Sequence, residues 1–589
     1  MPFPDCMCYI YPVFRIKYFC MRLIAYASGF WLVAALACQT SVPKADTILY
    51  NAVLFTADST HRGATALAIH NGRIIAVGQD DEVRRLAGPQ TELTDLRGAF
   101  AMPGFIEGHG HFAAMGQSLE SINLLEAPNW RNIVQQVADK ASALPSGAWL
   151  QGRGWHQDKW DEVPQPSVGA YPYHFALSEA VPNHPVVLTH ASGHALMANA
   201  RAMELAGISA ATPDPEGGRI LRDPKGNPIG VFEENAMDLI QKPLNDWLNS
   251  RTEAEKREAF ARTIALSAGH CLENGVTSFQ DAGSTFWELE RYREMAESGA
   301  LPVRLWAMIL QPKQADFERM SLYPIIGAGG GFFTCRAVKA YLDGALGSYG
   351  AWLLEPYTDK PELSGQVVTP IDTLALLAEQ CRTRGLQCCV HAIGDRANRE
   401  LLNLYEKMLA NEVGYGPDGL RWRIEHAQHV HPDDQPRFAR LGVIASVQTV
   451  HCTSDAPFVP VRLGAGRAAE NAYAWRAFLD SGARIANGTD VPVERLNPFA
   501  NLYAAVTRRS TAAGVFPGGK MSREEALLSY TLWNAWAAFE EGEKGSLSPG
   551  KVADIIVLSD NLVLCPENAI LNARVLQTIV GGKRQFLSK

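Results

Sequence analysis

Short apolar segments with the alternation of β-strands lie near both ends of the chain, with turn residues between them. One of them is interrupted by Asn71-Gly72, which is a strong hairpin signal between two apolar runs. Neither end has enough strands to bury a core alone. The sequence therefore predicts one small β-sandwich domain formed from both chain ends, with residues 45–102 as its first part and residues 545–589 as its second. The segments are residues 47–56, 66–77, 92–102, 554–558 and 575–580.

Between these ends, residues 103–544 alternate short apolar strands with helical stretches, which is the pattern of a βα repeat. Eight strands are expected, and eight is the number that closes a barrel. Helices over residues 253–273, 371–384 and 399–411 fill gaps between the strands. We therefore expect an α/β fold with a (β/α)8 TIM-like barrel. The predicted strands are residues 104–107, 276–280, 303–309, 337–342, 387–391, 423–426, 443–448 and 484–487.

A long insertion at about residues 112–270 separates the first two predicted strands. It is rich in tryptophan and includes a predicted helix over residues 195–206. Loops that follow barrel strands lie at the C-terminal mouth, where substrates bind, so we expect part of the insertion to contact substrate. The alternative is a structural subdomain. The candidate substrate contacts are Trp155, His190 and His194 in the insertion, and His451 after the seventh strand.

The N-terminal segment differs from the rest of the chain. Residues 23–37 carry no charge, and Arg22 precedes them. About 15 apolar residues match the core of a signal peptide, whereas a spanning helix needs roughly 20. We therefore predict that residues 1–38 are a signal peptide, with Met21 as a candidate true start, and that the protein is exported to the bacterial cell envelope. If the segment is not a signal, the protein stays in the cytoplasm.

The end of this segment, Ala35-Leu36-Ala37-Cys38, resembles a bacterial lipobox, in which a cysteine after small residues is lipidated. It departs from the usual pattern because leucine occupies the second position of the motif rather than the first. Two outcomes stay open. Lipidation of Cys38 would attach the protein to a membrane as a lipoprotein, and simple cleavage near Ala37 would release it into the periplasm.

Composition and charge narrow the class of protein. Of 589 residues, 47% are apolar and 20% are charged, which excludes collagen-like, low-complexity and disordered chains. A net charge of −8 without a long basic run argues against a nucleic-acid partner. The seven cysteines beyond Cys38 are scattered, and we interpret most of them as buried apolar residues. The oligomeric state stays open, with a homodimer as one option.

Metal-ligating side chains occur where the predicted strands end. His109 and His111 follow the first strand at positions i and i+2. Because an extended backbone alternates faces, both imidazoles point to the same side and can bind one cation. Histidines in this arrangement suit zinc or a neighbouring divalent metal.

Three more such residues follow later strands. His391 and His426 end consecutive predicted strands, and Asp490 follows the last one. The intervals between them correspond to about one and two βα units of roughly 30 residues. All three side chains are therefore expected at the same mouth of the barrel.

Lys339 is a charged residue within an otherwise apolar strand. Such a charge is costly unless it is paired or chemically altered. An inward lysine near two metal ions can lose its proton and take up carbon dioxide as a carbamate. The alternative is a lysine whose amino group extends to the solvent at the rim of the barrel.

Taken in order, these motifs resemble the amidohydrolase superfamily, and more narrowly its YtcJ-like branch, amidohydrolase family 3. The resemblance implies that His109 and His111 bind a first metal ion and that His391 and His426 bind a second. It also implies that carboxylated Lys339 bridges them. The expected cofactor is one or two divalent ions, most simply zinc. The matching blocks are residues 103–111, 190–195, 338–348, 391–395, 423–428, 488–497 and 551–555.

The resemblance further makes Asp490 both a metal ligand and a proton shuttle. A bound metal ion supplies hydroxide at neutral pH and polarises a carbonyl group. Asp490 would then accept a proton from the attacking water and pass it to the departing nitrogen. The implied reaction is hydrolysis of an amide-type carbon–nitrogen bond, other than a peptide bond, in a small molecule.

Two other functions are compatible with this fold and these residues. An ester or lactone hydrolase needs the same metal site, because activated hydroxide does not select the leaving atom. A catalytically silent, envelope-anchored binding protein is also compatible with the fold, since fold does not imply function. The complete set of ligand residues argues against the silent protein.

The N-terminal prediction is tested by mass spectrometry of the protein taken from its native envelope. We expect a mature chain that has lost residues 1–38 or begins at a lipidated Cys38, because residues 23–37 form a signal core. An intact chain that begins at Met1 would contradict export.

Overall fold

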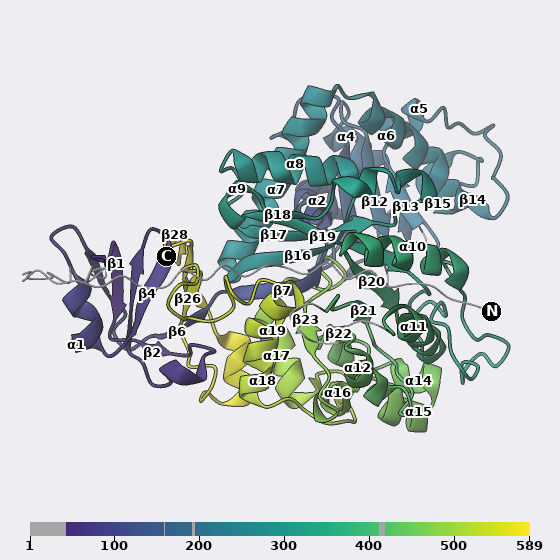
Figure 1. Cartoon of the computed structure of the whole chain (residues 1–589). Coiled ribbons are helices and arrows are strands. Elements are labelled where there is room, and N and C mark those ends of the chain that lie inside the picture. Colours follow the sequence, from purple (N-terminus) through teal and green to yellow (C-terminus); the bar gives the residue numbers. More distant parts are fainter. Residues whose placement is uncertain (1–42, 158–159, 191–194, 411–418, 589) are drawn as a thin grey trace, which may run out of the picture. The chain divides into compact units, whose positions relative to one another are not determined.

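The computed structural model describes residues 43–157, 160–190, 195–410 and 419–588 (Figure 1). The predicted signal segment with Cys38, and the candidate substrate contact His194, lie outside these residues. Within the described ranges, no helix combines the length and the apolar composition that a bilayer crossing requires.

Eight parallel strands form the barrel, as the sequence predicts, and neighbours in the sheet follow each other along the chain (Figure 1). The short β18 (Ile325–Gly327) adds to β19 antiparallel. Helices cover the outside and bury one continuous apolar core against the strands. The (β/α)8 TIM-like barrel is therefore confirmed. Its strands are β7 (Phe105–Gly110), β16 (Val276–Ser284), β17 (Arg304–Leu310), β19 (Phe333–Tyr341), β20 (Gln387–Ala392), β21 (Arg423–His426), β22 (Ile444–Val447) and β23 (Ile485–Asn487).

Local sequence signals explain where the covering helices begin and end. α7 (Glu253–Glu273) begins at Thr252, whose hydroxyl accepts a hydrogen bond from the backbone N–H of Glu255 while the Glu255 side chain accepts one from Thr252. α10 (Ile371–Arg384) ends at Gly385, which adopts a left-handed conformation. Both helices have the predicted bounds. α11 (Asp395–Met408) begins and ends a few residues earlier than predicted.

The seam between the first and last barrel strands is closed by a side chain. Asn534, in α19 (Leu532–Ala537), donates hydrogen bonds of 2.7 and 2.8 Å to the carbonyl oxygens of Ile106 and Asn487. Its own carbonyl oxygen accepts a 3.0 Å hydrogen bond from the backbone N–H of Asn487. A Cβ atom at Gly108 would lie 2.4 Å from the Asn487 carbonyl oxygen, so only glycine allows this close approach. One buried amide therefore replaces a backbone ladder between β7 and β23.

The insertion has a six-stranded sheet and apolar cores of its own. The predicted helix over residues 195–206 is wrong, because residues 195–198 form β13. α5 begins only after Asn199, whose side-chain oxygen accepts hydrogen bonds from the backbone N–H groups of Ala202 and Val186, each 3.0 Å long. This oxygen caps the helix and holds the preceding strand in extended conformation. The elements are β8 (Ile122–Asn123), β9 (Leu150–Trp155), β12 (Val186–His190), β13 (Ala195–Ala198), β14 (Gly218–Arg222), β15 (Pro228–Glu234), α3 (Trp130–Ala141), α4 (Phe175–Ala180), α5 (Ala200–Leu205) and α6 (Asp238–Ser250).

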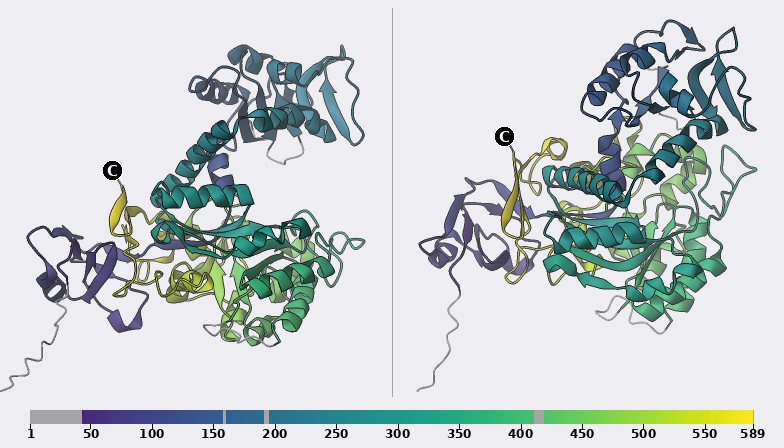
Figure 2. Two further views of the ribbon diagram at one scale, coloured as in Figure 1. Left: turned by 45° about the horizontal axis from the view of Figure 1, so that its top comes forward. Right: turned by 90° about the horizontal axis from the view of Figure 1, so that it is seen from above.

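Two further sheets, with strand orders β4-β3-β1-β5 and β2-β6-β26-β27-β28, share an apolar core. β6, from the N-terminal side, pairs antiparallel with β26, from the C-terminal side, so one sheet unites both chain ends (Figure 2). The Asn71-Gly72 turn joins β3 to β4 as predicted, and both residues have positive φ angles. The strands are β1 (Thr47–Tyr50), β2 (Val53–Leu54), β3 (Ala66–His70), β4 (Arg73–Gly78), β5 (Glu92–Asp95), β6 (Phe100–Pro103), β26 (Ile555–Leu558), β27 (Val575–Val580) and β28 (Lys583–Leu587).

A buried ion pair connects the barrel with this β domain. The guanidinium of Arg304, at the start of β17, donates hydrogen bonds of 2.7 and 3.1 Å to the two carboxylate oxygens of Asp554, next to β26. Both side chains are 5% exposed. Asp554 also accepts a 2.8 Å hydrogen bond from the backbone N–H of Gly581. The pair therefore ties three chain segments together in a site that is largely shielded from water.

Replacing Arg304 by alanine leaves the Asp554 carboxylate buried without its counter-charge. We expect a loss of about 3–5 kcal/mol in the free energy of unfolding, measured by urea denaturation. The matched control is Arg293→Ala, which removes an exposed ion pair with Glu297 and costs about 0.5 kcal/mol or less. Equal effects of the two substitutions would contradict the role of the buried pair.

Candidate metal centre

The six residues predicted as metal ligands come together at the C-terminal ends of the barrel strands. The rings of His109 and His426 have centroids 4.9 Å apart, and those of His426 and His391 are 4.5 Å apart. The ring of His111 lies 5.8 Å from that of His109. The histidines come from β7, β20 and β21 or directly follow them, and Lys339 on β19 and Asp490 after β23 complete the cluster.

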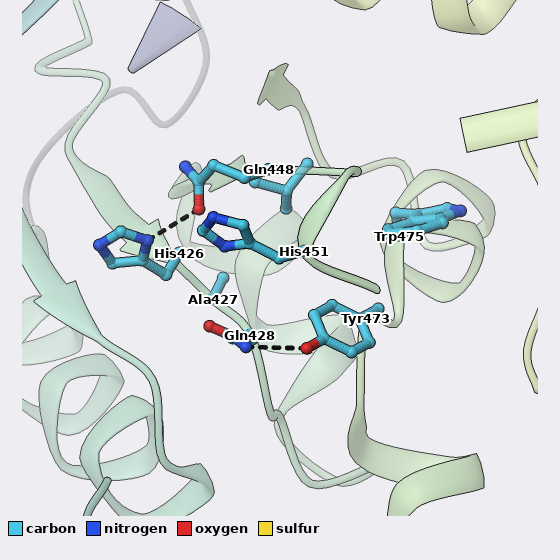
Figure 3. A pocket seen from close by; sticks show the side chains of 8 residues that line it. His426, Ala427, Gln428, Gln448, His451, Tyr473 and Trp475 are labelled. Atoms are coloured by element: carbon cyan, nitrogen blue, oxygen red, sulfur yellow. Dashed lines mark hydrogen bonds between the residues drawn. The ribbon is translucent and has the colours of Figure 1, made fainter. Parts of the chain in front are cut away.

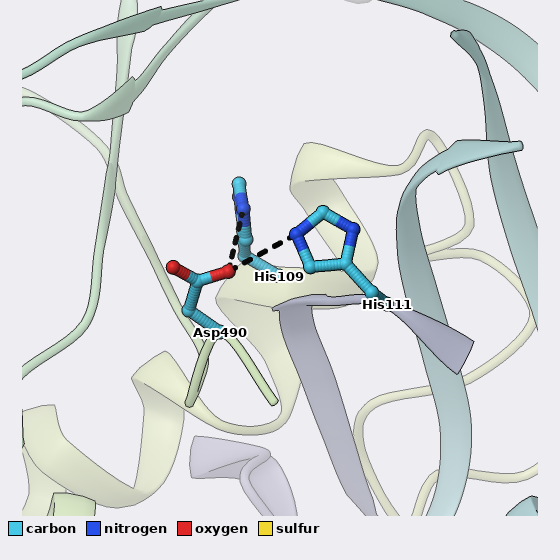
Figure 4. A group of neighbouring side chains, drawn as sticks. All are labelled: His109, His111 and Asp490. Carbon is cyan, nitrogen blue, oxygen red and sulfur yellow. Dashed lines mark ion pairs between the residues drawn. The ribbon is translucent and has the colours of Figure 1, made fainter. Parts of the chain in front are cut away.

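Three of these residues offer ligand atoms to a common point. Oδ1 of Asp490 lies 3.2 Å from Nε2 of His111 and 3.5 Å from Nε2 of His109, and the three atoms all lie within 4.8 Å of one another (Figure 4). This carboxylate oxygen is buried without a hydrogen bond. Lone pairs that face each other repel unless a positive charge lies between them, so the residues fit a divalent cation.

Glu425 orients the first of these histidines, a role that the sequence alone does not indicate. Nδ1 of His109 is hydrogen-bonded to a carboxylate oxygen of Glu425, and both side chains are 0% exposed. Burial by itself raises the pKa of this carboxyl group, but the charge and hydrogen bond of His109 lower it to about 2. With Nδ1 bound to Glu425, Nε2 of His109 is left for a metal ion. The available signal was an acidic residue within a predicted barrel strand, directly before the predicted ligand His426.

Lys339 lies inside the barrel, 1% exposed, rather than at the rim. Its Nζ atom is 3.4 Å from Nε2 of His109. Burial lowers the pKa of the Lys339 amine, while the nearby carboxylates of Glu425 and Asp490 act in the opposite direction. This environment favours an uncharged amine more than an exposed lysine does.

His391 and His426 line the other side of the cluster. Nδ1 of His426 is 2.7 Å from the side-chain oxygen of Gln448, which leaves Nε2 for another partner. Nε2 of His391 is buried without a hydrogen bond. Burial lowers the pKa of His391 to about 3 and that of His426 well below its ordinary value. Both imidazoles are therefore neutral, which is the form that binds metals.

Backbone contacts across the seam place Asp490 beside the histidine pair. The backbone N–H of Asp490 donates a 2.7 Å hydrogen bond to the carbonyl oxygen of His109. The backbone N–H of His111 donates a second 2.7 Å hydrogen bond to the carbonyl oxygen of Val491. His426 and Asp490 have φ angles of 74° and 60°, a conformation that costs non-glycine residues about 1–3 kcal/mol each. The surrounding hydrogen bonds hold both residues in these strained positions.

His451, a candidate substrate contact, stacks on His426, one of the predicted metal ligands. Its ring is 6.4 Å from that of His426, with an angle of 17° between the planes. Together with Gln428 and Tyr473 it lines a cavity of about 10 Å³, which is the room that one water molecule needs (Figure 3). The Tyr473 hydroxyl and the Gln428 amide both donate to the carboxylate of Asp455, at 2.8 and 2.9 Å.

The two described candidates in the insertion lie in its interior. Trp155 is fully buried, and its indole N–H donates a 2.8 Å hydrogen bond to the carbonyl oxygen of Leu188. Its ring is 4.8 Å from that of His190, which ends β12. The contacts of Trp155 are those of a core residue, and substrate contact by Trp155 and His190 stays a prediction.

A larger cavity lies where the insertion meets the loop that carries Asp490. It has a volume of about 410 Å³ and polar walls. Arg495, five residues beyond Asp490, forms an ion pair of 3.4 Å with Glu126 of the insertion. Neither residue belongs to a motif that the sequence alone indicates. The lining residues are Asn123, Glu126, Ala127, Gln136 and Arg495.

This fold and the His-His-Asp site define a metal-dependent hydrolase built on a (β/α)8 barrel. The chain belongs to the amidohydrolase family, whose model matches residues 92–586. The resemblance inferred from the motifs is thereby confirmed.

Similar proteins cover nearly the whole chain. The protein LONG AFTER FAR-RED 3 of Arabidopsis thaliana is 32% identical over 92% of both chains. The putative amidohydrolase YtcJ of Bacillus subtilis is 29% identical over 88% of this chain and 95% of its own. The N-substituted formamide deformylase of Arthrobacter pascens is 27% identical over 92% and 98%. A metal-dependent hydrolase of uncharacterised function from Pyrococcus horikoshii has a crystal structure with a TM-score of 0.70 and 25% identity, over 89% of this chain and 99% of its own.

The orienting role of Glu425 is tested with Glu425→Gln. The amide keeps the size of the side chain but removes the negative charge that holds the His109 ring, so metal affinity should fall about 10–100-fold, measured by titration with Zn²⁺. The control Glu379→Gln, on the exposed face of α10, should bind Zn²⁺ as the wild type does. Unchanged affinity in Glu425→Gln would rule the role out.

Proposed function

We propose that this protein hydrolyses an amide-type carbon–nitrogen bond, other than a peptide bond, in a small molecule, with one or two zinc ions as cofactor. The observation that carries the proposal is the convergence of His109, His111 and Asp490 on one point, with Oδ1 of Asp490 buried and without a hydrogen bond. The relative named N-substituted formamide deformylase supports a carbon–nitrogen bond.

The first ion is assigned to His109, His111 and Asp490, and a second to His391 and His426. A divalent ion bound there acidifies water and polarises a carbonyl oxygen. Neighbouring side chains orient the histidine ligands. Glu425 keeps His109 in the tautomer and orientation that expose Nε2, and Gln448 does the same for His426.

Lys339 is proposed to carry a carbamate. Its uncharged Nζ forms a bond with the carbon of carbon dioxide and releases one proton to water, which turns the neutral amine into a carbamate with one negative charge shared by two oxygens. The distance of 3.4 Å between Nζ and Nε2 of His109 supports a carbamate whose oxygens would lie beside the ligand atoms.

Asp490 is proposed to move the proton. Its carboxylate accepts a proton from the attacking water and donates it to the leaving nitrogen, so the same group acts as base and then as acid. The backbone hydrogen bond from Asp490 to His109 keeps the carboxylate at the histidine pair during both transfers.

The substrate is proposed to be a small molecule that reaches the mouth through the cavity between the insertion and the Asp490 loop. A volume of about 410 Å³ is within the range of small-molecule sites, roughly 300–1,000 Å³. Esters or lactones are the alternative substrates, since the same residues would support hydrolysis of an amide, an ester or a lactone.

We propose that the protein works in the bacterial cell envelope, as a periplasmic protein or as a lipoprotein attached through Cys38. The uncharged run over residues 23–37 supports export. We propose no nucleic-acid partner, because the chain has a net charge of −8. A homodimer is compatible with these proposals.

Two substitutions separate the roles of the residues. Asp490→Asn should keep bound zinc but lose most turnover, because the amide offers an oxygen ligand and cannot accept a proton. Lys339→Ala should lower the zinc content, with partial recovery when short carboxylic acids replace the carbamate. Turnover is measured against N-formyl, N-acyl, cyclic amide and lactone compounds, and zinc by elemental analysis.

The control is Lys407→Ala, which removes an exposed lysine from α11. A Lys339→Ala protein with the zinc content and turnover of this control would contradict the carbamate and the two-metal site. Hydrolysis of lactones but of no amide would contradict the proposed bond type alone.

A further inference from the structure

Tyr341 is the last residue of β19 and has no part in the metal centre described so far. Alternate residues of a strand point to the same side, so Tyr341 shares the side of Lys339. That side faces the barrel interior, because Ala337, two residues before Lys339, packs in the small inner core with Trp306. Tyr341 is therefore one layer above Lys339, towards the mouth.

The ring of Tyr341 borders the predicted metal ligands of two strands. Tyr341 is the direct neighbour of His391 in the parallel pairing of β19 and β20. The centroids of the two rings are 5.4 Å apart, with 45° between the planes. Nζ of Lys339 lies 5.1 Å from the centre of the tyrosine ring. These contacts hold the ring at the edge of the site.

The hydroxyl group of Tyr341 is available to a molecule that enters the mouth. Within the described residues it has no hydrogen-bond partner, and it is not among the buried polar atoms that lack one. Tyr341 is only partly buried, whereas Lys339 beneath it is buried. Tyr405 behaves differently, because its hydroxyl is 3.1 and 3.2 Å from the backbone oxygens of Cys388 and Arg423. A phenol beside a reaction centre, without a protein partner, is a free hydrogen-bond donor.

We propose that the Tyr341 hydroxyl donates a hydrogen bond to the oxygen of the scissile carbonyl as that oxygen becomes an oxyanion, which makes Tyr341 a catalytic residue. This inference rests on the proposed hydrolysis at the metal centre. No proton is transferred, and the phenol stays intact. A donor aimed at charge that develops only in the transition state accelerates the reaction, and removing one such donor costs about 10²–10³ in kcat.

The test is Tyr341→Phe, which keeps the ring against His391 and removes only the hydroxyl group. The probe is methylphosphonate, a tetrahedral oxyanion, titrated by calorimetry into the zinc-loaded protein. We expect binding at least about tenfold weaker than in the wild type, since the lost hydrogen bond goes to a charged oxygen. Zinc content and the midpoint of thermal unfolding should not change. With any amide that the wild type hydrolyses, kcat should fall and KM should stay within about twofold.

The matched control is Tyr405→Phe, on the outer side of the barrel wall. It loses hydrogen bonds to backbone oxygens, so it should unfold at a lower temperature yet bind methylphosphonate as the wild type does. Equal binding by Tyr341→Phe and the wild type would overturn the role of Tyr341 and leave the metal centre standing. A zinc-loaded wild-type protein that binds no methylphosphonate would also overturn the role of Tyr341.

The binding measurement separates this inference from the proposed function. A wild type that hydrolyses no amide, but binds methylphosphonate more tightly than Tyr341→Phe, would contradict the proposed reaction and still support a hydrogen bond from Tyr341 to a bound oxyanion.

Discussion

Closure of the barrel between its first and last strands is the constraint on which the rest of the site depends. His109 and His111 belong to the first strand and Asp490 follows the last, so a chain segment of nearly four hundred residues separates them. The buried amide of Asn534 bridges the two strands, and the backbone of Asp490 continues the contact by bonding to His109. Only a closed barrel gives the three ligand atoms a common point.

Buried charge is the cost of this arrangement, and pairing offsets it. Glu425 and Lys339 both lie in the interior, where an isolated charge is strongly unfavourable. Glu425 is paired with Nδ1 of His109. Lys339 lies at Nε2 of the same ring, where burial lowers the pKa of its amine and so favours the uncharged form. A divalent cation among these groups would balance the remaining negative charge of Asp490. The strained backbones of His426 and Asp490 are further signs that the mouth is organised for function rather than for stability.

Patterns along the chain predicted the elements well where burial and local signals agree. The eight apolar runs became the eight barrel strands, and the helix from residue 253 to residue 273 has the bounds that its capping residues indicate. The prediction failed over residues 195–206. There the apolar run was compatible with either a helix or a strand. The side chain of Asn199 accepts one hydrogen bond from Val186 on another strand and one from Ala202 in the helix, and these bonds favour a strand before Asn199 and a helix after it.

The sequence by itself determined the order of the candidate ligand residues and the ends of the strands that carry them, because histidine and aspartate side chains at the ends of predicted strands are a local pattern. Only the tertiary structure decided which residues support them. Glu425, Asn534 and Arg304 are polar residues in buried surroundings, and their partners His109, Asn487 and Asp554 lie 47 to 316 positions away along the chain. The free energy of such a pair depends on distance and burial in the folded chain, and neither quantity is written in the local sequence.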